Sequence, residues 1–204
     1  MGVTPLRRKE APAPGPEPAR MQEVLDVAAS MFAGRGYRGT SLNDIGEALG
    51  MNKASLYHYV RSKEDLLYRL ILRAGQRLRD VSQDPQLARL PAVAALERLV
   101  REHCRVVFEH RAELGVLVHQ RRYLELDADG EVTYRERVYV DHLKAVVARG
   151  IKEGTLRRVD PSLAVQLILD TVNGLLRWHR PDGRLGREAV TEQVWRYVKG
   201  GLAA

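Results

Sequence analysis

Residues 41–60 of this chain, SLNDIGEALGMNKASLYHYV, decide its fold. The Ser-x-x-Asp sequence at 41–44 is a capping box, which predicts a short helix that stops at Gly50. Asn52 can cap a second helix over 53–60. Two short helices joined by a short stop form the helix-turn-helix pattern, so this stretch predicts a unit that presents its second helix to a groove.

The second of these helices is too short to be stable alone, so its neighbours must hold it in place. Apolar residues repeat with helical spacing from Met21 to Phe32 and predict a helix over about 21–36. A second capping box at Ser62 starts a longer helix over 62–80. The buried contacts that fix the angle of the pair are expected from its apolar residues, Ile45, Leu49, Met51 and Leu56.

The remainder of the chain repeats the alternation of helix and stop. We expect further helices over about 91–110, 113–126, 131–153, 162–179 and 187–200. No stretch alternates apolar and polar residues clearly enough for a strand. The sequence therefore predicts an all-α fold of about nine helices. At the N-terminus, residues 1–18 hold five of the nine prolines and predict a disordered arm.

A chain of 204 residues with 45% hydrophobic and 29% charged content is typical of a globular protein with a sizeable core. No apolar run approaches the roughly 18 residues of a membrane-spanning helix, and no apolar segment with a cleavage site opens the chain. The single cysteine, Cys104, excludes a disulfide framework and a cysteine-based zinc site. We expect a cytoplasmic protein without a membrane partner.

The net charge of +7 favours a polyanionic partner. However, the residues up to Asp65 contain nine Lys and Arg against eight Asp and Glu, a net charge of only +1. Basicity therefore supports a nucleic-acid partner only weakly, and the case depends on the helix-turn-helix. Its second helix carries polar-tipped side chains that suit a DNA groove, namely Lys53, Ser55, Tyr57 and His58.

Three stretches, GYRGTSLNDI (36–45), LYHYV (56–60) and SKEDL (62–66), together resemble the TetR family of bacterial transcriptional regulators. The sequence departs from the family at Gly46, where alanine is usual, and at Val60, where an aromatic residue is usual. Both are packing positions. The resemblance implies that operator DNA is contacted by Thr40, Ser41, Lys53, Ser55, Tyr57, His58 and Lys63.

The resemblance also implies the domain organisation and the partners. A DNA-binding domain would cover 19–66, with the helix-turn-helix at about 41–60, and 67–204 would form the domain for effector binding and dimerisation. The two recognition helices of a homodimer would enter successive major grooves, about 34–36 Å apart, of a partly palindromic double-stranded operator. Binding of a small effector would release this repressor from its operator. No metal, no cofactor and no catalytic residue is expected.

Two helices near the C-terminus are the candidates for the dimer interface. The helix over 162–179 is apolar around most of its circumference, which a monomer of this size can rarely bury. The helix over 187–200 carries an apolar stripe. A two-fold four-helix bundle would explain both. We expect the interface to contain Leu163, Leu167, Val172, Leu175, Val194, Trp195 and Val198.

The segments RWHRPDG (177–183) and EHRAEL (109–114) indicate one subgroup within this family. They are similar to a TetR subgroup that represses fatty-acid, phenylacetate or sterol degradation genes and responds to acyl-CoA thioesters. Such a ligand needs an apolar tunnel for its chain and cations for its phosphates. For the phosphates we expect Arg121, Arg122 and Arg177, and for the thioester end Asn173 and Trp178.

Three other interpretations stay open. One is a regulator of an efflux pump that responds to hydrophobic drugs. Another is a metal sensor built on His103, Cys104 and His110, although a packed cysteine and two surface histidines explain these residues better. The last is an acyl-CoA enzyme, for which the sequence offers no activated nucleophile, carboxylate pair or glycine-rich phosphate loop.

Overall fold

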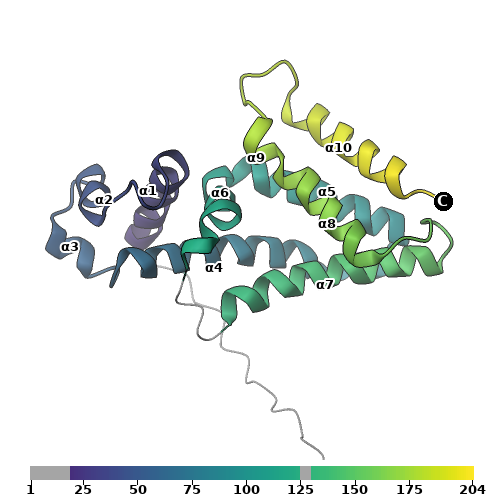
Figure 1. Cartoon of the computed structure of the whole chain (residues 1–204), viewed down its shortest axis with the longest axis horizontal. Coiled ribbons are helices and arrows are strands. Elements are labelled where there is room, and N and C mark those ends of the chain that lie inside the picture. The colour runs from purple at the N-terminus through teal and green to yellow at the C-terminus, as the bar shows by residue number, and fades with distance from the viewer. Residues whose placement is uncertain (1–18, 125–129) are drawn as a thin grey trace, which may run out of the picture.

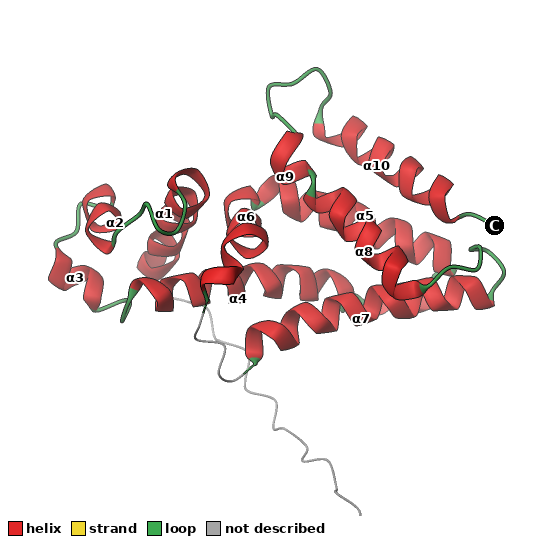
Figure 2. Ribbon diagram, in the orientation of Figure 1, coloured by secondary structure: helices red, strands yellow, loops and turns green. Residues whose placement is uncertain are grey.

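The computed structural model describes residues 19–124 and 130–204. Within these two ranges the protein consists of helices and connecting loops, without a β-strand (Figure 1, Figure 2). The elements are α1 (Ala19–Arg35), α2 (Leu42–Ala48), α3 (Lys53–Tyr57), α4 (Lys63–Ser82), η1 (Pro85–Arg89), α5 (Ala92–Glu109), α6 (Arg111–Gln120), η2 (Arg121–Tyr123), α7 (Glu131–Lys152), α8 (Pro161–Asn173), α9 (Leu175–Trp178) and α10 (Arg187–Leu202). The all-α fold predicted from the sequence is confirmed.

Helices α1–α3 lie together at the N-terminal end of α4, and we call this part, residues 19–66, the reading head (Figure 1). The apolar stripe predicted from Met21 to Phe32 is buried. Arg20 ties α1 to α2 because its guanidinium donates a hydrogen bond to the carbonyl of Leu49 at 3.1 Å. Helix α1 therefore holds α2 as expected, α3 packs against α2, and α4 packs against α1.

The N-caps predicted for this region are formed, but the capping box expected at Ser62 is incomplete, because the Asp65 carboxylate accepts the N–H of Arg61 instead of that of Ser62. The Ser41 hydroxyl accepts the N–H of Asp44 at 3.2 Å, and the Asp44 carboxylate accepts the N–H of Ser41 at 2.8 Å. Asn52 accepts the N–H of Ser55 at 2.8 Å, and Ser62 caps α4 in the same way. These bonds satisfy backbone groups that a helix start leaves free, so helices of only seven and five residues are sustained.

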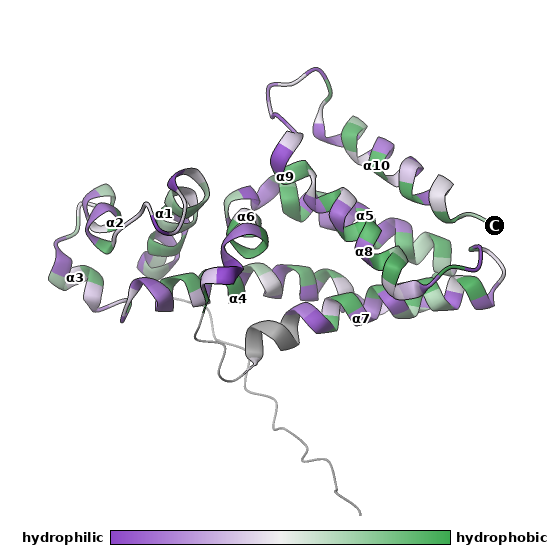
Figure 3. Ribbon diagram, viewed as in Figure 1, coloured by the Kyte–Doolittle hydropathy of each residue, from purple (hydrophilic) through white to green (hydrophobic). Residues whose placement is uncertain are grey.

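The rest of α4 and helices α5–α10 form a second lobe, which we call the sensor lobe (residues 67–204). Helix α4 runs from the reading head into this lobe, where α7 lies against it (Figure 1). Helix α5 packs against α7 and α8, and α10 covers α5 and α8. Apolar residues recur along these helices at helical spacing (Figure 3). The chain end is tied back by the N–H of Arg157, which donates to the carbonyl of Leu202 at 3.0 Å.

Two helices of the sensor lobe differ from the prediction. The helix expected over 162–179 is divided at Gly174 into α8 and α9, because glycine has a low helix propensity. The helix expected over 113–126 ends at Gln120 and is followed by the tighter η2. The predicted proline-rich arm, 1–18, and residues 125–129 lie outside the described residues. None of the described helices has an apolar stretch long enough to span a bilayer.

Candidate nucleic-acid interface and effector domain

The surface of α3 presents three side chains to solvent. Lys53, Tyr57 and His58 are exposed, and Tyr57 keeps 46% of its surface accessible despite its large ring. The ammonium of Lys53 lies 5.9 Å from the centre of the Tyr57 ring, so the cation and the ring share one face. Helix α3 ends at Tyr57, before the expected Val60, and Leu56 and Val60 are both buried. A helix this short offers only its first turn and its end to a DNA groove.

Two predicted contact serines flank this surface. Ser41 is exposed, and its hydroxyl accepts the N–H of Asp44 in the cap of α2. The backbone N–H and the hydroxyl of Ser41 lower the pKa of the Asp44 carboxyl, so the cap stays charged and closed near neutral pH. Ser55 is partly buried, and its backbone N–H is held by Asn52.

Thr40 and Lys63 hold the turn between α1 and α2. The Thr40 side chain is 1% exposed, and its hydroxyl donates to the carbonyl of Gly36 at 3.1 Å. The Lys63 ammonium donates to the carbonyls of Tyr37 and Thr40 at 3.0 and 3.1 Å and lies 4.3 Å from the centre of the Tyr37 ring. The expectation that the Thr40 side chain touches DNA is therefore corrected, because its hydroxyl faces the protein interior. Lys63 uses two of its three ammonium hydrogens inside the protein.

A pair of stacked tyrosines connects the reading head to the sensor lobe. The rings of Tyr37 and Tyr123 have centres 5.5 Å apart and planes inclined by 20°. The Arg38 and Arg122 guanidiniums lie 5.1 and 5.0 Å from the centre of the Tyr123 ring. The side chain of Gln120 accepts the N–H of Tyr37 at 3.4 Å. We call Tyr37 and Tyr123 the tyrosine stack; it joins the turn after α1 to η2.

A buried carboxylate makes the second connection between the lobes. Glu113 of α6 accepts two hydrogen bonds from Arg77, at 2.9 and 3.2 Å, and forms an ion pair with Arg73 at 3.0 Å. Arg73 in turn contacts Asp26 of α1 at 2.7 Å. These charges link α6 to α4 and, through Arg73, to α1.

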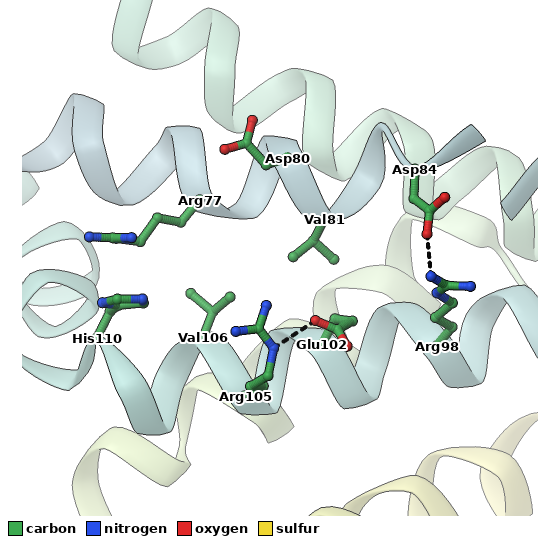
Figure 4. A pocket seen from close by; sticks show the side chains of 9 residues that line it. All are labelled: Arg77, Asp80, Val81, Asp84, Arg98, Glu102, Arg105, Val106 and His110. Atoms are coloured by element: carbon green, nitrogen blue, oxygen red, sulfur yellow. Dashed lines mark hydrogen bonds and ion pairs between the residues drawn. The ribbon is translucent and has the colours of Figure 1, made fainter. Parts of the chain in front are cut away.

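A groove of about 380 Å³ lies between α4 and α5 (Figure 4). Its wall is charged, and the arginines in it have acidic partners. Arg98 pairs with Asp84, and Arg105 donates to Glu102 at 2.8 Å (Figure 4). Arg77 is bonded to the buried carboxylate of α6. A wall of paired charges suits water better than an acyl chain, so this groove does not match the tunnel that the sequence led us to expect.

Two of the five predicted effector residues lie at the reading-head end of α6. The guanidinium of Arg121 donates to both carboxylate oxygens of Glu136 at 3.0 Å. Arg122 is exposed and rests on the Tyr123 ring, to whose hydroxyl it donates at 3.3 Å. Arg121 is therefore paired within the sensor lobe, and Arg122 lies beside the tyrosine stack.

The other three lie at the opposite end of α6. Asn173 ends α8, and Arg177 and Trp178 are exposed on α9. Arg111, which starts α6, holds this region because it donates to the carbonyls that begin α9. Since α6 has ten residues, about 15 Å of helix separates the two groups. The structure thus does not bring the five predicted residues into one site.

The residues of the metal-sensor interpretation do not converge. His103 is buried rather than on the surface as expected, its Nδ1 lies 3.0 Å from the hydroxyl of Tyr139, and burial lowers its pKa to about 4. Burial raises the pKa of Cys104 to about 12, which disfavours the thiolate that binds metals. His110 lies at the end of α5, in the wall of the charged groove. Among the described residues, no three His, Cys, Asp or Glu side chains are arranged for a metal ion.

The predicted dimer interface is only partly on the surface. Leu163 and Leu167 of α8 are 60% and 59% exposed, as an unpartnered interface requires. The other five predicted residues are buried within the protomer: Val172, Leu175, Val194, Trp195 and Val198. That expectation is corrected, because the inner face of α8 and the stripe of α10 are covered by the sensor lobe itself. On α10, Tyr197 is a large hydrophobic side chain that is exposed.

Sequence reasoning missed the contacts that join distant segments. Tyr37 and Tyr123 are far apart in the chain, so no local pattern relates them. The bond between His103 and Tyr139 had a weak signal, since each is a polar residue on an otherwise apolar helix face. Such a residue in a predicted core is a reason to search for a partner on another helix.

Comparison with known proteins identifies the class. Residues 24–70 match the family model "Bacterial regulatory proteins, tetR family", and residues 89–202 match "Tetracyclin repressor-like, C-terminal domain". The "HTH-type transcriptional repressor KstR2" of Mycobacterium tuberculosis is 33% identical over 193 residues, covering 90% of this chain and 93% of its own. Its structure, titled a ketosteroid transcriptional regulator, has a TM-score of 0.75 and covers 93% and 98% of the two chains at 29% identity.

Two further structures agree along most of the chain. The TetR family regulator PfmR from Thermus thermophilus is 30% identical, with a TM-score of 0.80 and coverage of 89% of this chain and 99% of its own. AibR, solved in complex with isovaleryl coenzyme A and operator DNA, is 27% identical, with a TM-score of 0.79 and coverage of 87% and 97%. The chain belongs to the TetR family of bacterial regulatory proteins. It is a DNA-binding transcriptional repressor of that family.

Proposed function

We propose that this repressor binds a partly palindromic operator as a homodimer and is released from it by an acyl-CoA thioester. The observation that supports this most is the likeness to AibR, whose solved complex contains both isovaleryl coenzyme A and operator DNA. KstR2, described as a ketosteroid regulator, supports a lipid-related ligand. The regulated genes would then serve degradation of lipids or related compounds.

In this proposal the reading head contacts DNA through α3 and its surroundings. Lys53, Tyr57 and His58 enter the major groove, because they are the exposed side chains of the short helix. Ser41 donates to a phosphate, and Lys63 contributes its remaining ammonium hydrogen. Thr40 and the partly buried Ser55 position the turn and the helix.

The dimer forms through the exposed face of α8 and α10. Leu163 and Leu167 lie four residues apart and so share one face of α8, and Tyr197 is exposed on the neighbouring α10. An isologous contact between two such faces removes these apolar side chains from water. It also places two copies of α3 symmetrically, as a partly palindromic operator requires.

The effector binds in the sensor lobe near the junction of α8 and α9. Arg177 follows Asn173 by one helical turn, and the backbone bonds from Arg177 and Trp178 to the Gly174 carbonyl continue that turn. Arg177 is exposed and suits a CoA phosphate. Arg121 and Arg122 are not included, because about 15 Å of helix α6 separates them from this junction.

Effector binding is proposed to move α6 and, through Glu113 and the tyrosine stack, to tilt the reading head. The two copies of α3 then no longer match the spacing of successive major grooves. Because coupling between two ligands is reciprocal, operator DNA must weaken effector binding by the same factor. Equal affinity for the effector with and without operator would contradict this mechanism.

The test is fluorescence anisotropy of the protein on its own upstream DNA, titrated with acyl-CoAs of increasing chain length. We expect tight binding that one chain-length class releases. Tight binding that every acyl-CoA leaves unchanged would reject the effector and favour hydrophobic drugs as ligands. Failure to bind that DNA would mean that the operator lies elsewhere, to be found by selection from genomic fragments.

Two exposed lysines provide a matched pair of variants. Lys53→Ala removes a cation from α3, whereas Lys152→Ala removes one from the far end of α7. We expect Lys53→Ala to weaken operator binding and to reduce the slope of log affinity against log salt by about 1. Lys152→Ala should leave both unchanged. Equal effects of the two substitutions would contradict the role proposed for α3.

A further inference from the structure

A hollow of about 410 Å³ lies where the reading head meets the sensor lobe. Its walls come from both lobes: Tyr37, Arg38 and Glu64 belong to the reading head, and Arg122 and Tyr123 belong to η2. Arg38 and Arg122 are exposed. Their guanidiniums lie 5.1 and 5.0 Å from the centre of the Tyr123 ring, so one ring supports a cation from each lobe. The hollow therefore offers two accessible cations on an aromatic support.

These two cations lack acidic partners. Among the described residues, neither Arg38 nor Arg122 forms an ion pair, whereas the neighbouring Arg121 is bonded to Glu136. Glu64 also lines the hollow, so the net charge of its wall is +1. Because both guanidiniums lie close to the centre of one ring, they repel each other. An anion bound between them would relieve this repulsion.

The position of the hollow favours a DNA phosphate as that anion. The Lys63 ammonium, whose third hydrogen is available to a phosphate, lies 4.3 Å from the centre of the Tyr37 ring. The Tyr37 ring stacks on Tyr123 at 5.5 Å, and Arg122 rests on that second ring. Three short contacts thus connect Lys63 to Arg122. Phosphates recur every ~3.4 Å along the axis of each strand, so a strand that passes Lys63 carries further phosphates past neighbouring cations.

The distribution of charge supports the same partner. The residues up to Asp65 carry a net charge of only +1, whereas the whole chain carries +7. Affinity for DNA depends largely on the phosphates that lysine and arginine neutralise. A reading head with so little excess charge is helped most by a cation from the other lobe. Arg122 is such a cation, because it is exposed on η2 beside the reading head.

We propose that Arg38 and Arg122 bind the DNA backbone next to the phosphate contacted by Lys63, so that the sensor lobe itself touches the operator. This inference rests on the proposed function, in which α3 enters the major groove. It moves Arg122, which the acyl-CoA resemblance assigned to the effector, to the DNA interface. Because η2 directly follows α6, a movement of α6 also withdraws this cation from the backbone. The effector then has a direct route to the DNA contact.

Arg38→Gln and Arg122→Gln test the contact, because each substitution removes the charge and keeps a polar side chain. The full-length proteins are titrated by fluorescence anisotropy against the upstream DNA and against a duplex of unrelated sequence, between about 50 and 200 mM salt. We expect each variant to bind both duplexes about three- to ten-fold more weakly than wild type at about 0.1 M salt. The slope of log affinity against log salt should fall by about 1 per protomer.

Two controls accompany these variants. Arg158→Gln removes an exposed arginine between α7 and α8, at the opposite end of the molecule from α3 (Figure 1), and should leave affinity and slope unchanged. Arg122→Lys keeps the charge and should restore most of the affinity and the slope. The unrelated duplex provides the test even where the operator lies elsewhere, because phosphate contacts do not depend on sequence.

The possible outcomes separate this proposal from the proposed function. Wild-type affinity and slope in Arg122→Gln overturn the contact by the sensor lobe, and Lys53→Ala still reports on α3. An effect confined to Arg38→Gln overturns it as well, because only the reading head then touches DNA. Weaker binding of Arg122→Gln with an unchanged slope also overturns it, since that result indicates a change of conformation. A reduced slope in Arg122→Gln beside an unaffected Lys53→Ala supports this contact and rejects the placement of α3.

Discussion

The reading head and the sensor lobe obtain their geometry in different ways. In the helix-turn-helix of the reading head the capping bonds are local: Ser41 with Asp44, and Asn52 with Ser55, each three residues apart. In the sensor lobe the bond of His103 spans 36 residues, to Tyr139. Local bonds are encoded in a motif, whereas distant bonds depend on how whole helices pack. The function of the reading head can therefore be predicted from a short stretch of sequence, whereas that of the sensor lobe cannot.

The two lobes also differ in where apolar and polar residues point. The reading head places its candidate contact residues, such as Lys53 and Tyr57, outside. The sensor lobe buries polar groups and leaves leucines of α8 exposed. The predictions that follow probe this contrast, beginning with the substitution that should have the largest effect.

Trp195→Ala should lower the free energy of unfolding by about 3–5 kcal/mol, because it opens a large cavity in the core of the protomer. Urea unfolding measures this. Leu167→Glu, on the exposed face, should instead dissociate the proposed dimer in analytical ultracentrifugation and leave the helix content intact. If Trp195→Ala produced stable monomers, the residue would belong to the interface, as the sequence first suggested.

The fold was predictable because its signals are short-range. Capping residues, glycine stops and apolar stripes located the helices, and the helix-turn-helix needed only residues 41–60. The dimer face was mistaken because an apolar stripe shows that a helix is buried, not which partner buries it; Val194 and Trp195 are covered by their own protomer. The five residues predicted for the effector lie at two ends of α6, because a local sequence pattern does not show which helices pack together. Adjacent arginines such as Arg121 and Arg122 indicate cations, but tertiary packing decides which acid or ring they meet.

The second prediction concerns pH and the buried imidazole of the sensor lobe. Burial lowers the pKa of His103 from 6.5 to about 4, so between these values the unfolded chain binds a proton that the folded chain does not. Above pH 6.5 this histidine leaves the free energy of unfolding unchanged. As the pH falls from 6.5 towards 4, the free energy of unfolding decreases by about 3 kcal/mol, because the unfolded chain gains the proton. Urea unfolding from about pH 7 to 4 should show this loss.

The matched variant for this titration is His103→Leu. Acidification also lowers the free energy of unfolding through carboxyl groups whose pKa is lowered by hydrogen bonds, such as Asp44 and Glu192. That contribution is the same in the wild type and in His103→Leu. The difference between the two pH profiles therefore isolates the imidazole. Parallel profiles would contradict burial of a neutral His103.

The third prediction separates structural from contacting residues within the reading head. Thr40→Val removes the hydroxyl that bonds the Gly36 carbonyl and should lower the free energy of unfolding by about 1–3 kcal/mol. Tyr57→Ala removes an exposed side chain, so it should leave stability within about 0.5 kcal/mol of wild type. Its operator affinity should nevertheless fall by about 1–3 kcal/mol. A Thr40→Val protein of normal stability that fails to bind operator would show that Thr40 touches DNA after all.

The prediction with the smallest expected effect tests whether Tyr37 of the reading head and Tyr123 of the sensor lobe interact. A double-mutant cycle with Tyr37→Leu and Tyr123→Leu should give a coupling energy of about 0.5–1.5 kcal/mol in urea unfolding, because the rings stack at 5.5 Å. The control cycle pairs Tyr37→Leu with Tyr197→Leu, whose ring is exposed on α10, and should be additive. Additivity in the first cycle would remove the stack as a route between the lobes. The buried Glu113, which joins α1, α4 and α6, would then be the remaining connection to test.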